Sequence, residues 1–305
     1  MRARSALFTL FGDVVRPAGG QAWLSTLTGC MNALGFTPEA TRTALHRMSA
    51  EGWVEHGKVG RYATYRLTPR GVDRLEEAAA RIYRLRAVEW DRRWRLLMCA
   101  DAGRRPELAK ALTWMGFGRL SSDTWVSPHP HGDRLATLLA EHDQPDALRF
   151  VTDARHADGD QDRRIVTQAW DFDVLHTAHA DFCARWGRIL VPGEPAAAFT
   201  TRIELVHHWR SFLFLDPGLP VSLLPVDWRG DEAARLFRSL YEAVEAPAWA
   251  FHDALATAAP AAGDPAPARD PAASPFARGL AALETARRDP HCELGVPRVP
   301  EKETA

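Results

Sequence analysis

The stretch of sequence that decides the fold is NALGFTPEATRTALHRMSAEGWVEHGKVGRYATYRLTPRG, which runs from Asn32 to Gly71. Thr37 followed by Pro38 is typical of a helix N-terminus, because threonine caps the first turn and proline fits its first position. The pattern predicts a helix from this cap to about Glu51, and Gly52 ends it. One side of this helix is apolar, and the opposite side is basic and polar.

A hairpin is predicted directly after this helix. Two strand candidates, Trp53–His56 and Tyr62–Leu67, are joined by the glycine-bearing segment GKVGR. Thr68-Pro69 then predicts the start of a long helix. Upstream, helical spacing predicts one helix beginning at Ser5 and a second that includes Trp23 to Leu34. This order of helices and hairpin is that of a winged helix-turn-helix.

The basic side of the third helix, with the hairpin tip, predicts a DNA-binding surface. In a helix-turn-helix this side enters the major groove, where arginine pairs with guanine and threonine meets a thymine methyl group. The tip adds cations suited to phosphates or the minor groove. A solvated basic face is the plain alternative, and the ordered caps and basic wing favour DNA over it. The predicted contacts are Arg42, Thr43, His46, Arg47, Lys58, Arg61 and Tyr62.

The charge distribution agrees with this interpretation. The formal net charge is −1, but residues 1–86 carry 13 Lys and Arg against 7 Asp and Glu, and the rest carries 25 against 32. A basic end joined to an acidic body is expected of a DNA reader attached to a regulatory body. No apolar run approaches membrane-spanning length, and Asp13 comes too early for a secretory signal. We therefore expect a cytoplasmic protein without membrane contact.

The next segment predicts a ferredoxin-like domain, which makes the fold class α+β. Strand candidates at Trp94–Ala100 and Leu148–Ala154 flank two helices, Pro106–Met115 and Arg134–Glu141. Between these helices, FGRLSSDTWVSP predicts two short strands around a turn at Ser121–Asp123. The resulting order, β-α-β-β-α-β, is that of the ferredoxin-like fold.

Helical patterns dominate the C-terminal part. A segment over Arg164–Leu190, broken near Trp170-Asp171, precedes helices predicted over Thr200–Phe214 and Asp231–Glu245. Residues 257–275 hold eight Ala and five Pro, a composition typical of a disordered linker. The predicted domains are a winged helix over 1–90, a ferredoxin-like dimerisation domain over 91–160, a helical regulatory domain over 161–256, and a disordered linker and tail over 257–305.

Seven motifs, taken in order, resemble the PaaX family of transcriptional repressors. They are ALFTLFGDVV, GFTPEATRTALHRMSAEGWV, GRYATYRLTPRG, WDRRWRLL, MGFGRLSSDTWVSP, AWDFDVL and HHWRSFLFLDPGLPVSLLPVDW, and they cover about residues 5–252. The resemblance implies DNA contacts by Arg42, Arg47, Lys58 and Arg61, and a homodimer on palindromic double-stranded operator DNA. It also implies repression of a phenylacetate-type catabolic operon, with release by an aryl-CoA thioester such as phenylacetyl-CoA as effector.

The residues support an acyl-CoA site only weakly by themselves. Arg104 and Arg105 precede a predicted helix whose N-terminus would help to bind phosphate. Tryptophans are numerous enough to line an aromatic pocket, and core packing explains them equally well. The ligand-binding candidates are Arg104, Arg105, Trp114, Trp170 and Trp209, with Trp125 and Trp228 as further tryptophans.

Two other function classes stay open. The middle domain is similar to a ferredoxin-like CRISPR-associated nuclease subunit, and Asp101 follows its first strand, where that nuclease binds a metal. A turn residue is the favoured interpretation of Asp101, so we expect no catalytic residue and no enzyme. His176, His179 and Cys183 share one side of a helix but lack a fourth ligand, so we expect no metal. The other class is an adaptor whose winged helix binds protein.

Overall fold

The computed structural model describes residues 1–83, 90–153, 159–225 and 228–258. These residues form two compact units. The first unit combines residues 1–83 with 179–212 and 229–258, and the second combines 90–178 with 213–228, apart from the gaps just given. The boundaries of the four segments expected from the sequence stay predictions. Of the expected linker and tail over 257–305, residues 257 and 258 belong to the last helix, and the rest lies outside the described residues.

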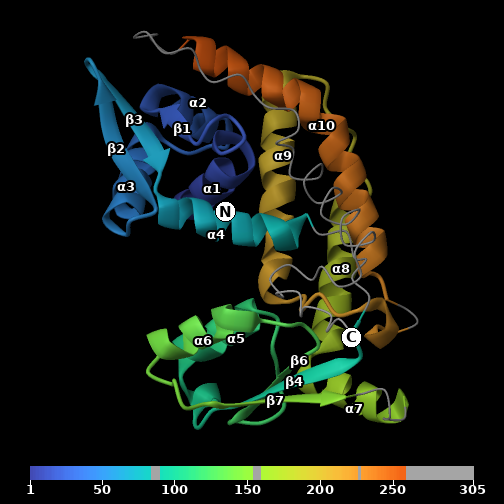
Figure 1. The fold of residues 1–305 in the computed structure, drawn as a ribbon. Coiled ribbons are helices and arrows are strands. Elements are labelled where there is room, and N and C mark those ends of the chain that lie inside the picture. The colour runs from blue at the N-terminus through green and yellow to red at the C-terminus, as the bar shows by residue number, and fades with distance from the viewer. Residues whose placement is uncertain (84–89, 154–158, 226–227, 259–305) are drawn as a thin grey trace, which may run out of the picture. The chain divides into compact units, whose positions relative to one another are not determined.

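The N-terminal part of the first unit is a winged helix (Figure 1). Three antiparallel strands form its sheet in the order β1-β3-β2. The caps expected at Thr37 and Thr68 are confirmed, since each side-chain oxygen accepts a hydrogen bond from a backbone N–H of the first turn. The elements are α1 (Ala3–Leu10), the π-helical turn η1 (Phe11–Val15), β1 (Gln21–Trp23), α2 (Leu24–Ala33), α3 (Pro38–Ala50), β2 (Val54–Val59), β3 (Tyr62–Leu67) and α4 (Pro69–Ile82).

Three details of the sequence interpretation of this part are wrong. The first helix does not begin at Ser5, since α1 starts at Ala3 with Arg2 as its N-cap residue. Trp23 does not begin a helix, because Gly19 and Gly20, at φ +99° and +77°, turn the chain so that β1 pairs with β3. The segment GKVGR is not all loop, since β2 continues to Val59 and leaves Gly60 and Arg61 as the two-residue connection. Lys58 therefore lies on a strand near the hairpin tip.

The second unit contains the ferredoxin-like sheet predicted from the sequence. Its four strands are antiparallel and lie in the order β5-β6-β4-β7. Helices α5 and α6 contribute to the apolar cluster on one face of the sheet, and α7 to the cluster on the other (Figure 1). The elements are β4 (Arg93–Met98), α5 (Pro106–Trp114), β5 (Gly118–Arg119), β6 (Thr124–Ser127), α6 (Gly132–Glu141), β7 (Leu148–Asp153) and α7 (Gly159–Ala169).

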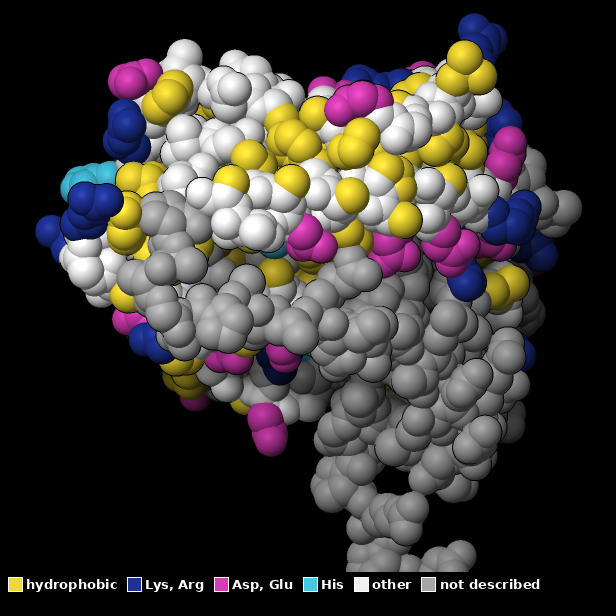
Figure 2. All heavy atoms as spheres, turned by 90° about the horizontal axis from the view of Figure 1, so that it is seen from above, with side chains coloured by type: hydrophobic (Ala, Val, Ile, Leu, Met, Phe, Trp, Pro, Cys, Tyr) yellow, Lys and Arg dark blue, Asp and Glu magenta, His cyan; other side chains and the backbone are white. Residues whose placement is uncertain are grey.

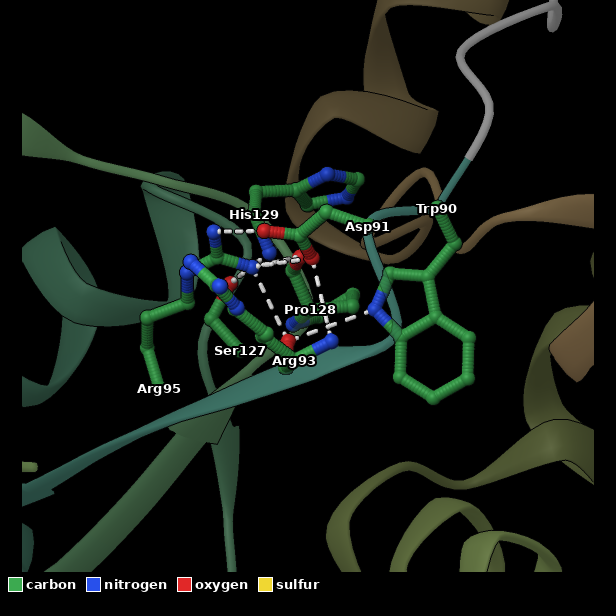
Figure 3. Close-up of polar contacts among 7 residues, drawn as sticks. All are labelled: Trp90, Asp91, Arg93, Arg95, Ser127, Pro128 and His129. Atoms are coloured by element: carbon green, nitrogen blue, oxygen red, sulfur yellow. Dashed lines mark hydrogen bonds and ion pairs between the residues drawn. The ribbon is translucent and has the colours of Figure 1, made fainter. Parts of the chain in front are cut away.

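A polar cluster joins the start of β4 to the end of β6 (Figure 3). Asp91 accepts two hydrogen bonds from Arg95, one of them over 2.8 Å between Nη1 and Oδ1. Arg95 Nη1 also donates to the Pro128 carbonyl at 2.8 Å, and Ser127 Oγ accepts from the His129 N–H. Arg95 therefore connects the chain before β4 to the end of β6, through a partly buried, charge-assisted pair with Asp91 and a hydrogen bond to Pro128.

The C-terminal helices are α8 (Phe172–Trp186), α9 (Pro195–Trp209) and α10 (Gly230–Ala258). The break predicted near Trp170 is confirmed between α7 and α8. The prediction that the last helix ends at Glu245 is wrong, because α10 continues through Pro247. Buried residues on both sides of that proline, among them Trp249, hold the helix on its core, and this packing outweighs the missing N–H.

One hydrophobic core unites the winged helix with α9 and α10. Leu10, Phe11 and Met31 from the winged helix are fully buried in the same cluster as Phe199 and Trp249. Figure 1 shows α9 and α10 side by side, as their packing requires. The two C-terminal helices α9 and α10 are thus part of the same folded unit as the winged helix. None of the described helices is long and apolar enough to cross a bilayer.

Candidate DNA-binding surface

Helix α3 has one buried face and one exposed face, as the sequence predicts. Thr41, Ala44, Leu45 and Met48 are buried. The four predicted contacts on the opposite face, Arg42, Thr43, His46 and Arg47, are all exposed. Thr37 Oγ1 accepts from the Ala40 N–H at 3.2 Å, which fixes the first turn beneath this face.

Arg42 has an acidic neighbour on the same face. Its Nη1 lies 3.3 Å from Glu39 Oε1, and both side chains are more than half exposed. A hydrogen bond from the backbone N–H of Glu39, with help from Thr37 and Arg42, lowers the pKa of this carboxyl group. Such exposed pairs contribute little free energy. Glu39 therefore orients the guanidinium without holding it back from a base.

The hairpin tip presents its cations close together. Val59 pairs with Tyr62, and Gly60 between them has φ +59°, as the first loop position of a type II′ turn requires. Arg61 Nε donates to Tyr62 Oη at 2.9 Å, and its guanidinium lies 5.1 Å from the ring centre. Lys58 and Arg61 are exposed and Tyr62 is half-buried.

Figure 2 shows Lys and Arg side chains and a histidine gathered at the left, the side on which Figure 1 places the β2–β3 hairpin. The winged helix thus carries two exposed basic features, the outer face of α3 and the hairpin tip. Together they have the chemistry to contact base edges and phosphates of a duplex.

Comparison with known proteins identifies all three parts of the chain. Residues 2–71 match the family model for PaaX-like proteins. Residues 87–166 match the PaaX central Cas2-like domain, and residues 170–254 match the PaaX-like C-terminal domain. The chain is 31% identical over 259 residues to the transcriptional repressor PaaX of Escherichia coli, covering 81% of this chain and 82% of that protein.

The chain belongs to the PaaX family of transcriptional repressors. Its fold is also similar to that of a solved structure, the uncharacterized protein Rv0674 of Mycobacterium tuberculosis. The TM-score is 0.53 at 22% identity, over 83% of this chain and 98% of the other. That likeness concerns the fold alone.

The tryptophans suggested for the effector each pack against neighbours in their own unit of this PaaX-family chain. Trp209 lies in the first unit, where it stacks on Phe237 at 4.7 Å and donates to a backbone carbonyl. Trp114 is buried near Phe214, with ring centres 5.1 Å apart, and Trp170 packs against Gly118. These tryptophans have the packing roles that the sequence left open as an alternative.

The two arginines proposed for phosphate lie beside each other in sequence. Arg104 is 77% exposed and pairs with Asp101 over 3.2 Å. Arg105 is the residue that precedes α5, and this helix starts with Pro106. Both arginines are exposed, and their contact with a phosphate stays a prediction.

The residues weighed for metal chemistry are also accounted for. Asp101 has φ +55°, and its backbone N–H donates to Asp123 Oδ1 at 2.9 Å, which gives it the geometry of a turn residue. His179 is buried and stacks on Phe212, with ring centres 4.5 Å apart. Within the described ranges, no three His, Cys, Asp or Glu side chains are grouped to hold a metal ion.

The most buried ion pair of the first unit was not predicted from the sequence. Asp13 in η1 and Arg202 in α9 form an ion pair of 2.7 Å, with side chains 1% and 2% exposed. Tyr83 and Tyr241 donate to Asp13 Oδ1 at 2.9 and 2.7 Å. The pKa values of both tyrosine hydroxyl groups are raised, mainly because the groups are buried and secondly because the Asp13 carboxylate is negatively charged. A single aspartate within an apolar run was the available signal.

This Asp13 cluster connects three sequence-distant parts of the unit. Arg202 also lies over two rings, 4.3 Å from the centre of Tyr241 and 5.2 Å from that of Trp249. Nearby, Arg210 donates to hydroxyl groups of α1. The orientation of the winged helix on α9 and α10 is therefore fixed by a charged, directional contact as well as by apolar packing.

Proposed function

We propose that this PaaX-family chain is a repressor that binds double-stranded operator DNA through α3 and the β2–β3 hairpin. The observation that carries this proposal is the exposure of Arg42, Thr43, His46 and Arg47 on one face of α3, close in sequence to the basic hairpin tip. The guanidinium groups are not turned into the core. A protein of this kind acts in the cytoplasm, on chromosomal DNA.

The finer proposal concerns the operator, the operon and the effector. One winged helix reads too few base pairs for specificity, so two copies would bind a palindromic site as a homodimer. Membership of the PaaX family supports control of an aromatic, phenylacetate-type catabolic operon. It likewise supports release by an aryl-CoA thioester, with phenylacetyl-CoA the first choice.

Two substitutions should separate base reading from phosphate binding. We expect Arg42→Ala to relax sequence selectivity, at a loss of about 1–3 kcal/mol on the preferred operator. Lys58→Ala should weaken binding to all sequences alike and flatten the salt dependence by about one unit of slope. Fluorescence anisotropy with operator and scrambled duplexes across a salt series measures both. Parent-like binding by both variants would show that the contact surface lies elsewhere.

The effector proposal has its own measurement. We expect phenylacetyl-CoA to release the protein from operator DNA and to raise its melting temperature, because a ligand that binds the native state stabilises it. Free phenylacetate and coenzyme A serve as separate controls and should do neither. Release by the free acid, or release by no tested compound, would remove aryl-CoA esters from consideration while leaving the DNA-binding assignment intact.

A further inference from the structure

Strand β7 is an exposed and apolar sheet edge. It is the last strand in the order β5-β6-β4-β7, and its inner side pairs with β4. Leu148, Phe150 and Val151 are 58%, 48% and 64% exposed. Proteins usually protect such an edge with a proline, a bulge or several charges, because its backbone N–H and C=O groups are a template for another strand. β7, with the sequence LRFVTD, contains no proline.

An apolar patch continues from this edge onto one face of the sheet. The register of β4 and β7 sets Met98 opposite Leu148 and Leu96 opposite Phe150, so these four side chains share a face. Met98 is 46% exposed. A strand added beside β7 would therefore satisfy the backbone groups of the edge and extend cover over this patch.

The sequence of β7 is complementary to itself when two copies run antiparallel. If a two-fold axis passes through Val151, Arg149 of one copy stands opposite position 153 of the other, which is an aspartate. The symmetry repeats this opposition, so two pairs of unlike charge flank the axis. Moving the axis by one residue to Phe150 would set Arg149 opposite Val151 and lose both pairs.

We propose that a second copy of this chain binds at β7, antiparallel and centred on Val151, so that two four-stranded sheets join into one. This inference rests on the homodimer of the proposed function and names its surface. Charge complementarity favours a second copy over an unrelated strand, because both halves of the contact are encoded in the same six residues. An isologous contact of this kind also has the two-fold symmetry that a palindromic operator requires.

Charge exchange tests the pairing and its register. Arg149→Asp sets like charges opposite each other at both pairs, and Asp153→Arg does the same with the opposite sign. We expect each single variant to weaken dimerisation roughly tenfold or more, and the double variant to regain parent-like association. Analytical ultracentrifugation of the full chain across a concentration series measures this. Circular dichroism shows whether each variant is folded, and the double variant controls for effects of either residue alone.

The results that overturn the proposal are distinct. A parent protein that stays monomeric at high micromolar concentration contradicts it. Single variants that dimerise as strongly as the parent show that the dimer forms through another part of the chain than β7. If the double variant dimerises as weakly as the single variants, the register that sets Arg149 opposite Asp153 is wrong.

A crosslinking experiment tests the axis directly. Val151→Cys brings two thiols together at the two-fold axis, so mild oxidation should give a disulfide-linked dimer on a non-reducing gel. Thr152→Cys is the matched control, because position 152 stands opposite Phe150 and should crosslink no more than the parent with its natural cysteines. Equal crosslinking at both positions contradicts an axis at Val151.

DNA binding separates failure of this inference from failure of the proposed function. If the single charge variants are monomeric and bind a half-site like the parent but a full palindrome more weakly, both stand. If they stay dimeric and bind operator DNA normally, only the β7 interface is overturned. If the parent is a β7 dimer without affinity for any duplex, the interface stands and the repressor function fails.

Discussion

Replacing Arg202 by methionine is expected to cost about 3–5 kcal/mol of the free energy of unfolding, because it leaves the Asp13 carboxylate buried without its cation. Tyr83 and Tyr241 still donate to this carboxylate, but neutral hydroxyl groups do not compensate a charge that is removed from water. Methionine keeps much of the apolar length of the side chain, so lost packing is a minor part of the effect. Urea denaturation followed by circular dichroism measures it.

Arg210 supplies the matched control. It too contacts α1 and is partly buried, but its partners are the hydroxyl groups of Ser5 and Thr9 rather than a carboxylate. We expect Arg210→Met to cost only about 1.5–3 kcal/mol, the range for hydrogen bonds that involve a charged group. Equal losses from the two substitutions would contradict the special role of Asp13.

A double variant shows whether the cost arises from the unpaired charge. Asp13→Asn removes the negative charge, so adding it to Arg202→Met should recover part of the lost stability. The coupling free energy of this cycle is expected to be about 1–3 kcal/mol, as for two groups in direct contact. Additive losses would mean that the two side chains act independently.

The elements that sequence patterns predicted well are those with local signals. Thr37-Pro38 and Thr68-Pro69 each combine a capping hydroxyl group with a residue restricted to the first helical turn, and both helices start where predicted. The basic face of α3 follows from helical spacing alone, since Ala44 and Met48 repeat every four residues. Such signals lie within a few residues and need no knowledge of the rest of the chain.

The elements that the sequence did not reveal depend on distant partners. β1 is three residues long and exists because β3, more than forty residues later, pairs with it. Pro247 normally ends a helix, and only the apolar surface beneath Trp249 keeps α10 continuous. The pair Asp13–Arg202 spans 189 positions, a separation at which one sequence without relatives contains no pairing signal.

The second large effect concerns the winged helix by itself. A fragment of residues 1–84 contains every predicted DNA contact, yet we expect it to lack a cooperative unfolding transition and to bind no operator DNA. Its core is completed by Phe199, Ile203 and Trp249, which belong to α9 and α10. The fragment also contains Asp13 but lacks two of its partners, Arg202 and Tyr241. Domains of this size have little stability to lose.

A substitution in the full chain makes the same point without truncation. Phe199 is 1% exposed in the shared core, and Phe199→Ala is expected to cost about 3–5 kcal/mol. If the winged helix and the two C-terminal helices form one cooperative unit, DNA binding and helical signal are lost at the same, lower temperature. Leu190→Ala, at a position 93% exposed between α8 and α9, is the matched control and should melt like the parent.

These results would also explain how a signal reaches the DNA-binding surface. A winged helix that folds only on α9 and α10 responds to any ligand that changes the packing or stability of those helices, since the two share one core. A fragment that melts cooperatively and binds operator DNA would contradict this, as would a Phe199→Ala protein that keeps operator binding above the melting temperature of its C-terminal helices. Regulation would then require a contact outside this core.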